Sequence, residues 1–270
     1  MINFSIEDKV AVITGGAGIL CSMMGRELSK LGAKVALLDL NGEMANIVAD
    51  EINQAGGNAI GVAVNVLDKA SIEAAKDTVM TKYGRVDILI NGAGGNKPAA
   101  TASSDLTFFD MPADAVQWVL NLNLMGTLLP SQVFGKVMAG QGEGSIVNIS
   151  SMAAFTPLTN TVAYSAAKSA ISNFTQWLSV YLCHNVSSKI RVNAIAPGFL
   201  HTQQNHFLLE DADGNPTQRG KNIIAATPMG RYGLPEELVG GVVYLCSEAA
   251  SFVTGIVLPI DGGYLAFSGV

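Results

Sequence analysis

The chain has 270 residues, of which 49% are apolar and only 14% are charged, so it can bury a sizeable core in one domain or two. A net charge of −6 without basic clusters argues against nucleic acid and anionic membranes as partners. MINFSIEDKV does not resemble a signal peptide, and no apolar run is long enough to span a membrane. Cys21, Cys183 and Cys246 lie far apart, which is typical of a reduced, cytoplasmic protein.

Short aliphatic runs alternate with longer helical patterns along the chain. The runs are apolar on both faces, as expected for strands buried between two layers of helices. The expected strands cover residues 10–14, 35–40, 60–66, 86–92, 145–151, 190–198 and 256–263. The expected helices cover residues 19–31, 44–55, 71–83, 111–138, 164–184 and 235–247.

This alternation predicts an α/β fold, with a single Rossmann-type, doubly wound parallel sheet of about seven strands and helices on both faces. No proline-rich linker divides the chain, so residues 1–270 are expected to form one domain. The polar stretch 199–229 follows a strand end and breaks the rhythm. Because ligands of this fold bind beyond the carboxyl ends of strands, we expect this stretch to be a substrate lid.

A glycine-rich turn, TGGAG, follows the first expected strand. Gly15 and Gly18 permit a tight turn that a pyrophosphate can approach closely. The next helix begins with Ile19 and Leu20, and its free N–H groups and dipole favour a phosphate. The spacing is not G-x-G-x-x-G, so a plain glycine turn is the alternative interpretation.

Asp39 ends the second expected strand, 21 positions after Gly18. A carboxylate there can accept hydrogen bonds from the adenosine ribose of a dinucleotide, and it would repel the 2′-phosphate of NADP. Neither the glycine turn nor residues 40–42 contain a lysine or arginine that would offset this repulsion. We therefore expect NAD as the cofactor, preferred over NADP, although an ordinary acid at a strand end is the simpler interpretation.

Tyr164 and Lys168 lie four positions apart in VAYSAAKSA, with only small residues between them. On a helix this spacing places both side chains on one face, about one turn apart. The pair could be a solvated surface pair or a phenol tuned for acid–base chemistry. The segment alone does not decide between the two.

Together these motifs resemble the short-chain dehydrogenase/reductase family over nearly the whole chain. TGGAG is one residue shorter than the family's T-G-x-x-x-G-x-G, and Leu20 replaces the last glycine. NGAG, PGFLHT and IDGG resemble the family's later motifs, and Asn65 stands where the family has aspartate. The resemblance implies cofactor contacts from Gly15, Gly18, Ile19, Leu20, Asp39, Asn65, Val66, Asn91, Ala93, Gly94, Tyr164, Lys168, Pro197, Gly198 and Thr202.

The family's catalytic tetrad is matched by Asn123, Ser151, Tyr164 and Lys168, and Ser151 lies thirteen positions before Tyr164. The resemblance implies that Ser151 holds the substrate oxygen and that Asn123 holds a water linked to Lys168. Lys168 would bind the nicotinamide ribose. Its charge would lower the pKa of Tyr164 from about 10, so that Tyr164 acts as base in alcohol oxidation and as acid in ketone reduction.

Further segments, such as NGAGGNKPAAT and APGFLHTQQNHFLL, resemble the sugar-acid branch of this family, the D-mannonate oxidoreductases or fructuronate reductases. This resemblance implies NAD(P)-linked interconversion of D-mannonate and D-fructuronate. A gluconate 5-dehydrogenase or another sugar or polyol dehydrogenase is the alternative. A 3-oxoacyl carrier-protein reductase is less favoured because of Asp39, and a non-catalytic NAD-binding sensor because Tyr164 and Lys168 are both present.

A sugar acid needs hydrogen-bonding groups and a cation, and such residues follow the NGAG turn and populate the expected lid. The candidate substrate residues are Asn96, Lys97, Ser151, Met152, Tyr164, His201 and Gln204. The three histidines show no metal-ligand spacing with cysteines or acids, so no metal site is expected.

Helices 111–138 and 164–184 carry apolar residues on more than one face, and the family usually pairs them, so we expect a homotetramer.

Overall fold

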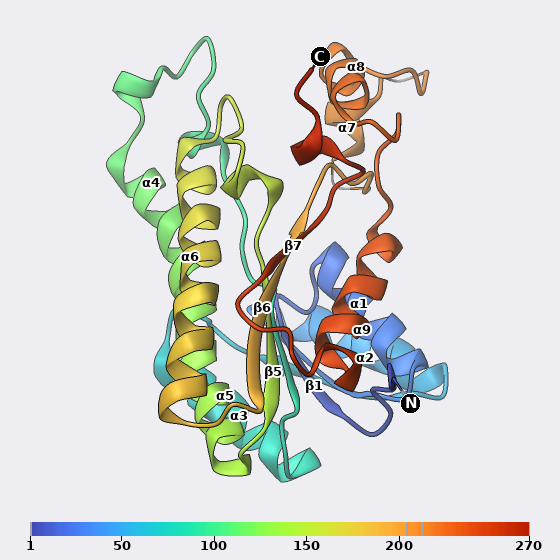
Figure 1. The fold of residues 1–270 in the computed structure, drawn as a ribbon. Coiled ribbons are helices and arrows are strands. Elements are labelled where there is room, and N and C mark those ends of the chain that lie inside the picture. Colours follow the sequence, from blue (N-terminus) through green and yellow to red (C-terminus); the bar gives the residue numbers. More distant parts are fainter. Residues whose placement is uncertain (1, 204, 212, 270) are drawn as a thin grey trace.

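In the part of the chain that the structure describes, seven parallel strands form one sheet (Figure 1). The computed structural model describes residues 2–203, 205–211 and 213–269. The strands are β1 (Val10–Thr14), β2 (Lys34–Asp39), β3 (Asn58–Ala63), β4 (Ile88–Asn91), β5 (Gly144–Ile149), β6 (Ile190–Pro197) and β7 (Val257–Ile260). Their order is β3-β2-β1-β4-β5-β6-β7, which confirms the predicted fold class. The direction of winding reverses between β1 and β4, where doubly wound sheets bind their ligands.

Helices cover both faces of the sheet (Figure 1). One layer contains α1 (Ile19–Lys30), α2 (Gly42–Gln54) and α9 (Val239–Cys246), and the other contains α3 (Lys69–Tyr83), α5 (Gly126–Gln141) and α6 (Val162–Asn185). Alternate residues of β1 pack against the two helix layers: Ile13 belongs to the hydrophobic cluster on one face of the sheet and Val12 to the cluster on the other. The strand therefore has no polar face, as its sequence indicated.

The helix expected over residues 111–138 is interrupted, which corrects the prediction. It consists of α4 (Ala113–Leu120), a π-helical turn (Asn121–Met125) and α5. In the wide turn the N–H of Gly126 donates to the carbonyl of Asn121, five residues earlier, and the side chain of Asn123 donates to Val119 at 2.8 Å. Apolar residues continue through this turn, so the sequence pattern did not reveal it. Such π turns often lie at functional sites.

Among the described residues of the segment 199–229 are two short helices, α7 (His206–Leu209) and α8 (Gln218–Ala226). Figure 1 shows both beyond the carboxyl end of the sheet, close to the C-terminus. An isolated parallel β-bridge between Leu200 and Gly233 connects the start of the segment to the chain that follows it. The segment thus lies where a lid would lie, and the lid function stays a prediction.

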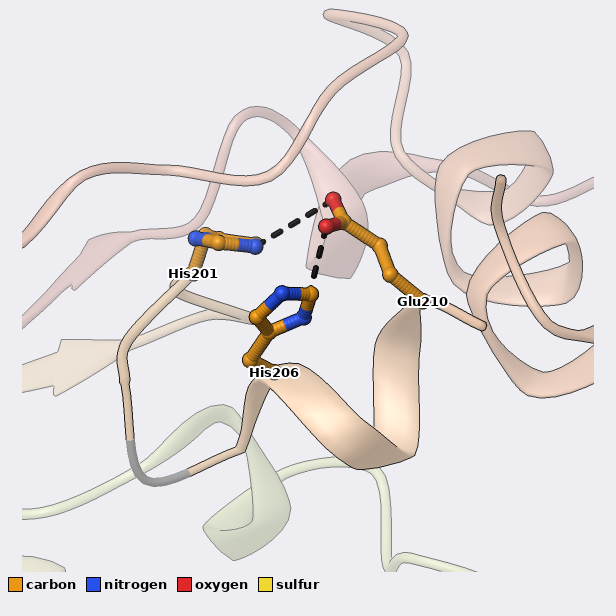
Figure 2. A group of neighbouring side chains, drawn as sticks. All are labelled: His201, His206 and Glu210. Atoms are coloured by element: carbon orange, nitrogen blue, oxygen red, sulfur yellow. Dashed lines mark ion pairs between the residues drawn. The ribbon is translucent and has the colours of Figure 1, made fainter. Parts of the chain in front are cut away.

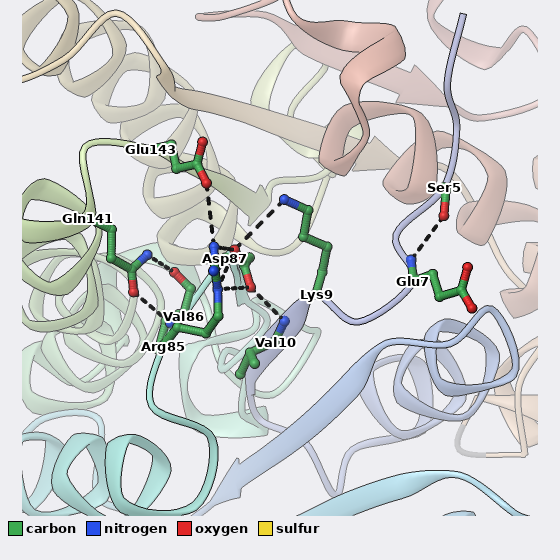
Figure 3. Close-up of polar contacts among 9 residues, drawn as sticks. All are labelled: Ser5, Glu7, Lys9, Val10, Arg85, Val86, Asp87, Gln141 and Glu143. Atoms are coloured by element: carbon green, nitrogen blue, oxygen red, sulfur yellow. Dashed lines mark hydrogen bonds and ion pairs between the residues drawn. The ribbon is translucent and has the colours of Figure 1, made fainter.

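A polar cluster lies at the opposite, amino end of β1 and β4 (Figure 3). Asp87 is 5% exposed, accepts the N–H of Val10 at 2.9 Å and pairs with Arg85 and Lys9. Gln141 bonds both main-chain groups of Val86, which precedes β4. These contacts join β1 to β4 at the end of the sheet away from the expected ligand site, so they stabilise the sheet.

Within the described part of the chain, no helix is both long and apolar enough to cross a bilayer.

Candidate active site

The glycine turn after β1 packs tightly against the loop after β4. Gly15 has a φ of +66°, and a Cβ atom on it would lie 2.9 Å from the Cα of Ala93. The hydroxyl of Thr14 accepts the N–H groups of Gly92 and Ala93 at 3.1 and 3.3 Å. The two loops therefore form one surface at the point where the strand order reverses.

This surface fits a dinucleotide pyrophosphate. Gly18 is the N-cap of α1, and no described side chain caps the N–H groups that follow at Ile19 and Leu20. A Cβ atom at residue 18 would lie 3.1 Å from the carbonyl oxygen of Gly15. The turn is therefore tight, and without a side chain at Gly18 its backbone N–H groups are open to a ligand. Free N–H groups at a helix N-terminus are suited to phosphate oxygens. Their contact with a cofactor stays a prediction.

Asp39, at the carboxyl end of β2, is tied to the glycine turn. Its carboxylate accepts the N–H of Ala17 at 3.1 Å and that of Asn41 at 2.9 Å. The neighbouring β3 ends at Ala63, so Asn65 and Val66 lie in the loop beyond it. The amide oxygen of Asn65 accepts the N–H of Leu67 at 3.0 Å. The three predicted adenosine-side residues thus lie at adjacent strand ends.

Asn91 has a structural role that the sequence did not indicate. This residue at the end of β4 is 1% exposed, and its amide donates to Ser131 at 2.9 Å and to Asn148 at 2.8 Å. Asn148 donates in turn to Thr175 at 2.9 Å. The side chain of Asn91 therefore joins the sheet to α5 and α6, and its contact with a cofactor stays a prediction.

Two catalytic candidates, Asn123 and Lys168, meet beside the loop after β4. A Cβ atom on Gly94 would lie 2.6 Å from Oδ1 of Asn123 and 3.5 Å from Nζ of Lys168. Asn123 is fully buried; its amide nitrogen donates to Gly95 at 2.7 Å and to Val119 at 2.8 Å. Residue 94 must therefore be glycine to allow this approach. The π turn is what brings Asn123 to the loop.

Ser151 and Tyr164 complete the group. Ser151 follows β5 and accepts the N–H of Ala153 at 3.1 Å, in a turn that also buries Met152. Tyr164 lies in the first turn of α6 and forms a side-chain hydrogen bond with Ser151. Nζ of Lys168 lies 5.5 Å from the centre of the Tyr164 ring. The helix expected to carry Tyr164 and Lys168 on one face does so.

One prediction about this pair is wrong for the protein chain alone. Burial raises the pKa of Tyr164 above its usual value, and the hydrogen bond with Ser151 offsets only part of this rise. Burial also lowers the pKa of Lys168 to about 8, and its ammonium donates to the carbonyl of Ile149 at 2.7 Å. Desolvation is therefore the main influence on the pKa of the phenol, and it acts in the direction opposite to the one expected.

The motif after β6 lies at the same edge of the sheet. Pro197 ends the strand, and a Cβ atom on Gly198 would lie 2.6 Å from the Cα of Asp261 beyond β7. The N–H of Thr202 donates to the side chain of Asn205 at 2.9 Å. Contacts of Pro197, Gly198 and Thr202 with the nicotinamide end of the cofactor stay predictions.

The candidate substrate residues are less closely grouped. Asn96 donates to the hydroxyl of Thr101 at 2.9 Å. Nζ of Lys97 lies 5.0 Å from the centre of the Trp118 ring on α4, which is a cation–π contact. Gln204 lies outside the described residues. Substrate contacts from Asn96 and Lys97 therefore stay predictions.

His201 belongs to a group that the sequence analysis missed. The structure brings His201, His206 and Glu210 together, with ligand-type atoms within 4.8 Å of one another (Figure 2). His206 and Glu210 are four residues apart at α7, and this helical spacing was the available signal. His201 lies before the helix, so its distance in sequence gave no indication of the third member.

Comparisons with known proteins agree with this geometry. A family model described as enoyl-(acyl carrier protein) reductase matches residues 20–265. The chain is similar to a Haemophilus influenzae structure described as a "putative D-mannonate oxidoreductase" with bound NAD, at 50% identity and a TM-score of 0.93, over 98% of both chains. It is 35% identical to D-threitol dehydrogenase of Mycolicibacterium smegmatis, over 97% of this chain and 95% of the relative. A gluconate 5-dehydrogenase from Burkholderia cenocepacia J2315, in complex with NADP and tartrate, is 28% identical with a TM-score of 0.87 over 98% of both chains.

The doubly wound sheet, the bare glycine turn and the tyrosine–lysine pair define an NAD(P)-dependent oxidoreductase. The chain belongs to the short-chain dehydrogenase/reductase family, and it is an enzyme that acts on alcohol or keto groups. The carrier-protein description belongs to the family model and names no reaction of this chain.

Proposed function

We propose that this enzyme transfers a hydride between NAD and a sugar acid, interconverting D-mannonate and D-fructuronate. The similarity to the NAD-bound Haemophilus influenzae protein, at 50% identity over 98% of the chain, carries the proposal. The grouping of Ser151, Tyr164 and Lys168 beside the loop after β4 supports it.

We propose catalytic roles for these residues, which the contacts of the site support. NAD(P), when bound, supplies or accepts the hydride. Ser151 holds the reacting oxygen of the substrate, and Tyr164 exchanges a proton with it. Because burial raises the pKa of Tyr164, the phenol is protonated at neutral pH and ready to donate to a ketone. Oxidation of the alcohol requires the phenolate, so its rate should rise with pH.

A panel of aldonates and ketouronates, each with NAD or NADP, tests the proposal through the absorbance of the reduced cofactor. D-Mannonate and D-fructuronate should give the highest kcat/KM. The similarity to a gluconate 5-dehydrogenase favours gluconate as the second candidate substrate. A higher kcat/KM for gluconate or a neutral polyol would contradict the D-mannonate proposal, and absence of turnover with every substrate would favour an NAD-binding sensor.

We propose that Asp39 makes the enzyme prefer NAD to NADP. Asp39→Ala removes the acceptor for the ribose hydroxyls and the charge that repels a 2′-phosphate. Because a hydrogen bond to a charged group contributes about 1.5–3 kcal/mol, NADH binding should weaken about 10-fold or more. The ratio of kcat/KM with NADH to kcat/KM with NADPH should fall. The measurement is a titration of each cofactor.

Asp39→Asn is the matched control, because its amide oxygen can still accept the N–H of Ala17 in the glycine turn, although the contact of the second carboxylate oxygen with the N–H of Asn41 is lost. It should keep the glycine turn in place and relax the discrimination against NADPH. A wild-type enzyme with the higher kcat/KM for NADPH would contradict the assignment of Asp39.

We propose that Lys97 binds the substrate carboxylate, because it follows the loop beside the catalytic group. Lys97→Met keeps an apolar stem against Trp118 and removes the charge. KM for a sugar acid should rise about 10-fold, the factor that about 1.4 kcal/mol represents, while KM for a neutral polyol of equal length should hardly change. Lys97→Arg should retain most of the affinity. Equal responses of both substrates would mean that Lys97 only packs on Trp118.

We also propose that the enzyme is a cytoplasmic homotetramer and that residues 199–229 close over its substrate. Free Cys21, Cys183 and Cys246 support a reducing compartment. Exposed Trp177, stacked on Tyr181 along α6, supports association through this helix. A monomer mass in light scattering at micromolar concentration would contradict the tetramer.

A further inference from the structure

Two imidazoles converge on one carboxylate at the start of the segment 199–229 (Figure 2). Nε2 of His201 lies 3.2 Å from Oε1 of Glu210, and Nδ1 of His206 lies 3.4 Å from Oε2 of the same side chain. The two imidazole ring centres are 5.5 Å apart. None of these three side chains belongs to the catalytic group described above.

The local chain holds the three side chains in this arrangement. The side chain of Asn205 accepts the N–H of Thr202 at 2.9 Å and donates to the carbonyl of Leu200 at 2.7 Å, which closes the loop between the two histidines. The N–H of His201 donates to Gly233 at 2.8 Å. One turn of α7 then places Glu210 on the same side as His206. The loop, its anchor and the helix thus hold the three side chains together.

The three groups lie close enough together to share one metal ion. Ligand atoms around a tetrahedral Zn²⁺, each about 2.0–2.1 Å from the ion, lie about 3.3 Å apart. Nε2 of His201 lies 3.2 Å from Oε1 of Glu210 and Nδ1 of His206 lies 3.4 Å from Oε2, and both distances are close to this value. One ligand atom from each of the three residues lies within 4.8 Å of the others, so a small adjustment of the side chains would let them share one ion. Nε2 of His201 is buried and forms no hydrogen bond with the described residues, although it lies near Glu210. A buried nitrogen whose lone pair or proton has no well-aligned partner is costly unless a ligand satisfies it.

We propose that His201, His206 and Glu210 bind a divalent transition metal ion, with Zn²⁺ the best fit. Imidazole nitrogens favour zinc and its neighbours over Mg²⁺ and Ca²⁺, which prefer oxygen ligands. Three protein ligands leave a fourth coordination position for an oxygen ligand such as water. The ion fastens the chain that leaves β6 to α7, and so stiffens the segment at the carboxyl edge of the sheet. This site is additional to hydride transfer.

Zinc binding to the full-length protein, without a histidine tag, tests the proposal. Isothermal titration with Zn²⁺ should show one site per chain, and Mg²⁺ should give no comparable binding. His201→Ala, His206→Ala and Glu210→Gln should each weaken Zn²⁺ binding more than about 10-fold, the smallest loss expected even for an outer-shell partner. His184→Ala is the matched control: the third histidine is exposed at the end of α6 beside Cys183, and its loss should leave the affinity unchanged.

A spectroscopic measurement separates the loss of the site from loss of the fold. Co²⁺ in the wild-type protein should give the visible absorption of a four-coordinate site, and the three variants should lack it while keeping the wild-type circular dichroism and cofactor binding. Zn²⁺ should raise the melting temperature of the wild type and of His184→Ala only. Absence of Zn²⁺ binding at micromolar concentration, or undiminished binding in the His201→Ala/His206→Ala double variant, would overturn the proposal.

Discussion

Tyr164→Phe is expected to lower kcat at least about 100-fold and to leave NADH binding nearly intact. The change removes one hydroxyl, which is the group proposed to exchange a proton with the substrate. It also removes the hydrogen bond with Ser151, whereas the ring can keep its place beside Lys168. Steady-state turnover and NADH fluorescence titration measure the two effects separately.

Tyr181→Phe is the control, because this exposed tyrosine on the same helix stacks on Trp177 away from the catalytic group. It should retain wild-type turnover. If Tyr164→Phe keeps more than about a third of wild-type kcat, the phenol is not the acid–base group.

Lys168→Met is expected to abolish activity, with kcat/KM at least about 100-fold lower, and to stabilise the protein without cofactor at neutral pH. Activity falls because the substitution removes the cation beside Tyr164 and Gly94. The stabilisation follows from burial, which lowers the pKa of Lys168 from 10.5 to about 8. Turnover and thermal melting measure the two effects.

The pH dependence of this stabilisation has a definite sign. Between about pH 8 and 10.5 the unfolded chain keeps a proton on residue 168 that the folded chain has lost, so the stability of the wild type rises across this window. Below about pH 8 both states are protonated, and the buried charge costs up to about 3 kcal/mol. Methionine removes this cost and also loses the hydrogen bond to Ile149, so we expect a net gain of about 1–2 kcal/mol at pH 7.

The expected rise in melting temperature at pH 7 is about 2–8 °C, and it should shrink as the pH approaches 10. Comparing wild type and Lys168→Met at both pH values is therefore an internal control. A variant that melts below the wild type at pH 7 would show that the ammonium stabilises the fold instead of straining it.

The fold was predictable because its signals are local and repeated. The strand expected over residues 10–14 agrees residue for residue with β1, and the other six expected strands overlap β2 to β7. Apolar runs separated by helical patterns can be buried on both faces only in a sheet covered by two helix layers. The break at Asn121–Met125 escaped prediction because the apolar pattern continues through the π turn, and hydrogen bonds of Asn123 to Gly95 and Val119 hold it.

By itself, the sequence determined the sheet, the glycine turn and the shared face of Tyr164 and Lys168, because each depends on neighbours a few residues apart. Only the tertiary structure decided the direction of the Tyr164 pKa shift and the approach of His201 to Glu210. Desolvation depends on what packs around a group from distant elements, and it is the largest cause of the raised pKa of Tyr164. The histidine–glutamate cluster likewise forms because Asn205 and Gly233 anchor the loop that bends His201 back toward α7, a contact that sequence spacing does not encode.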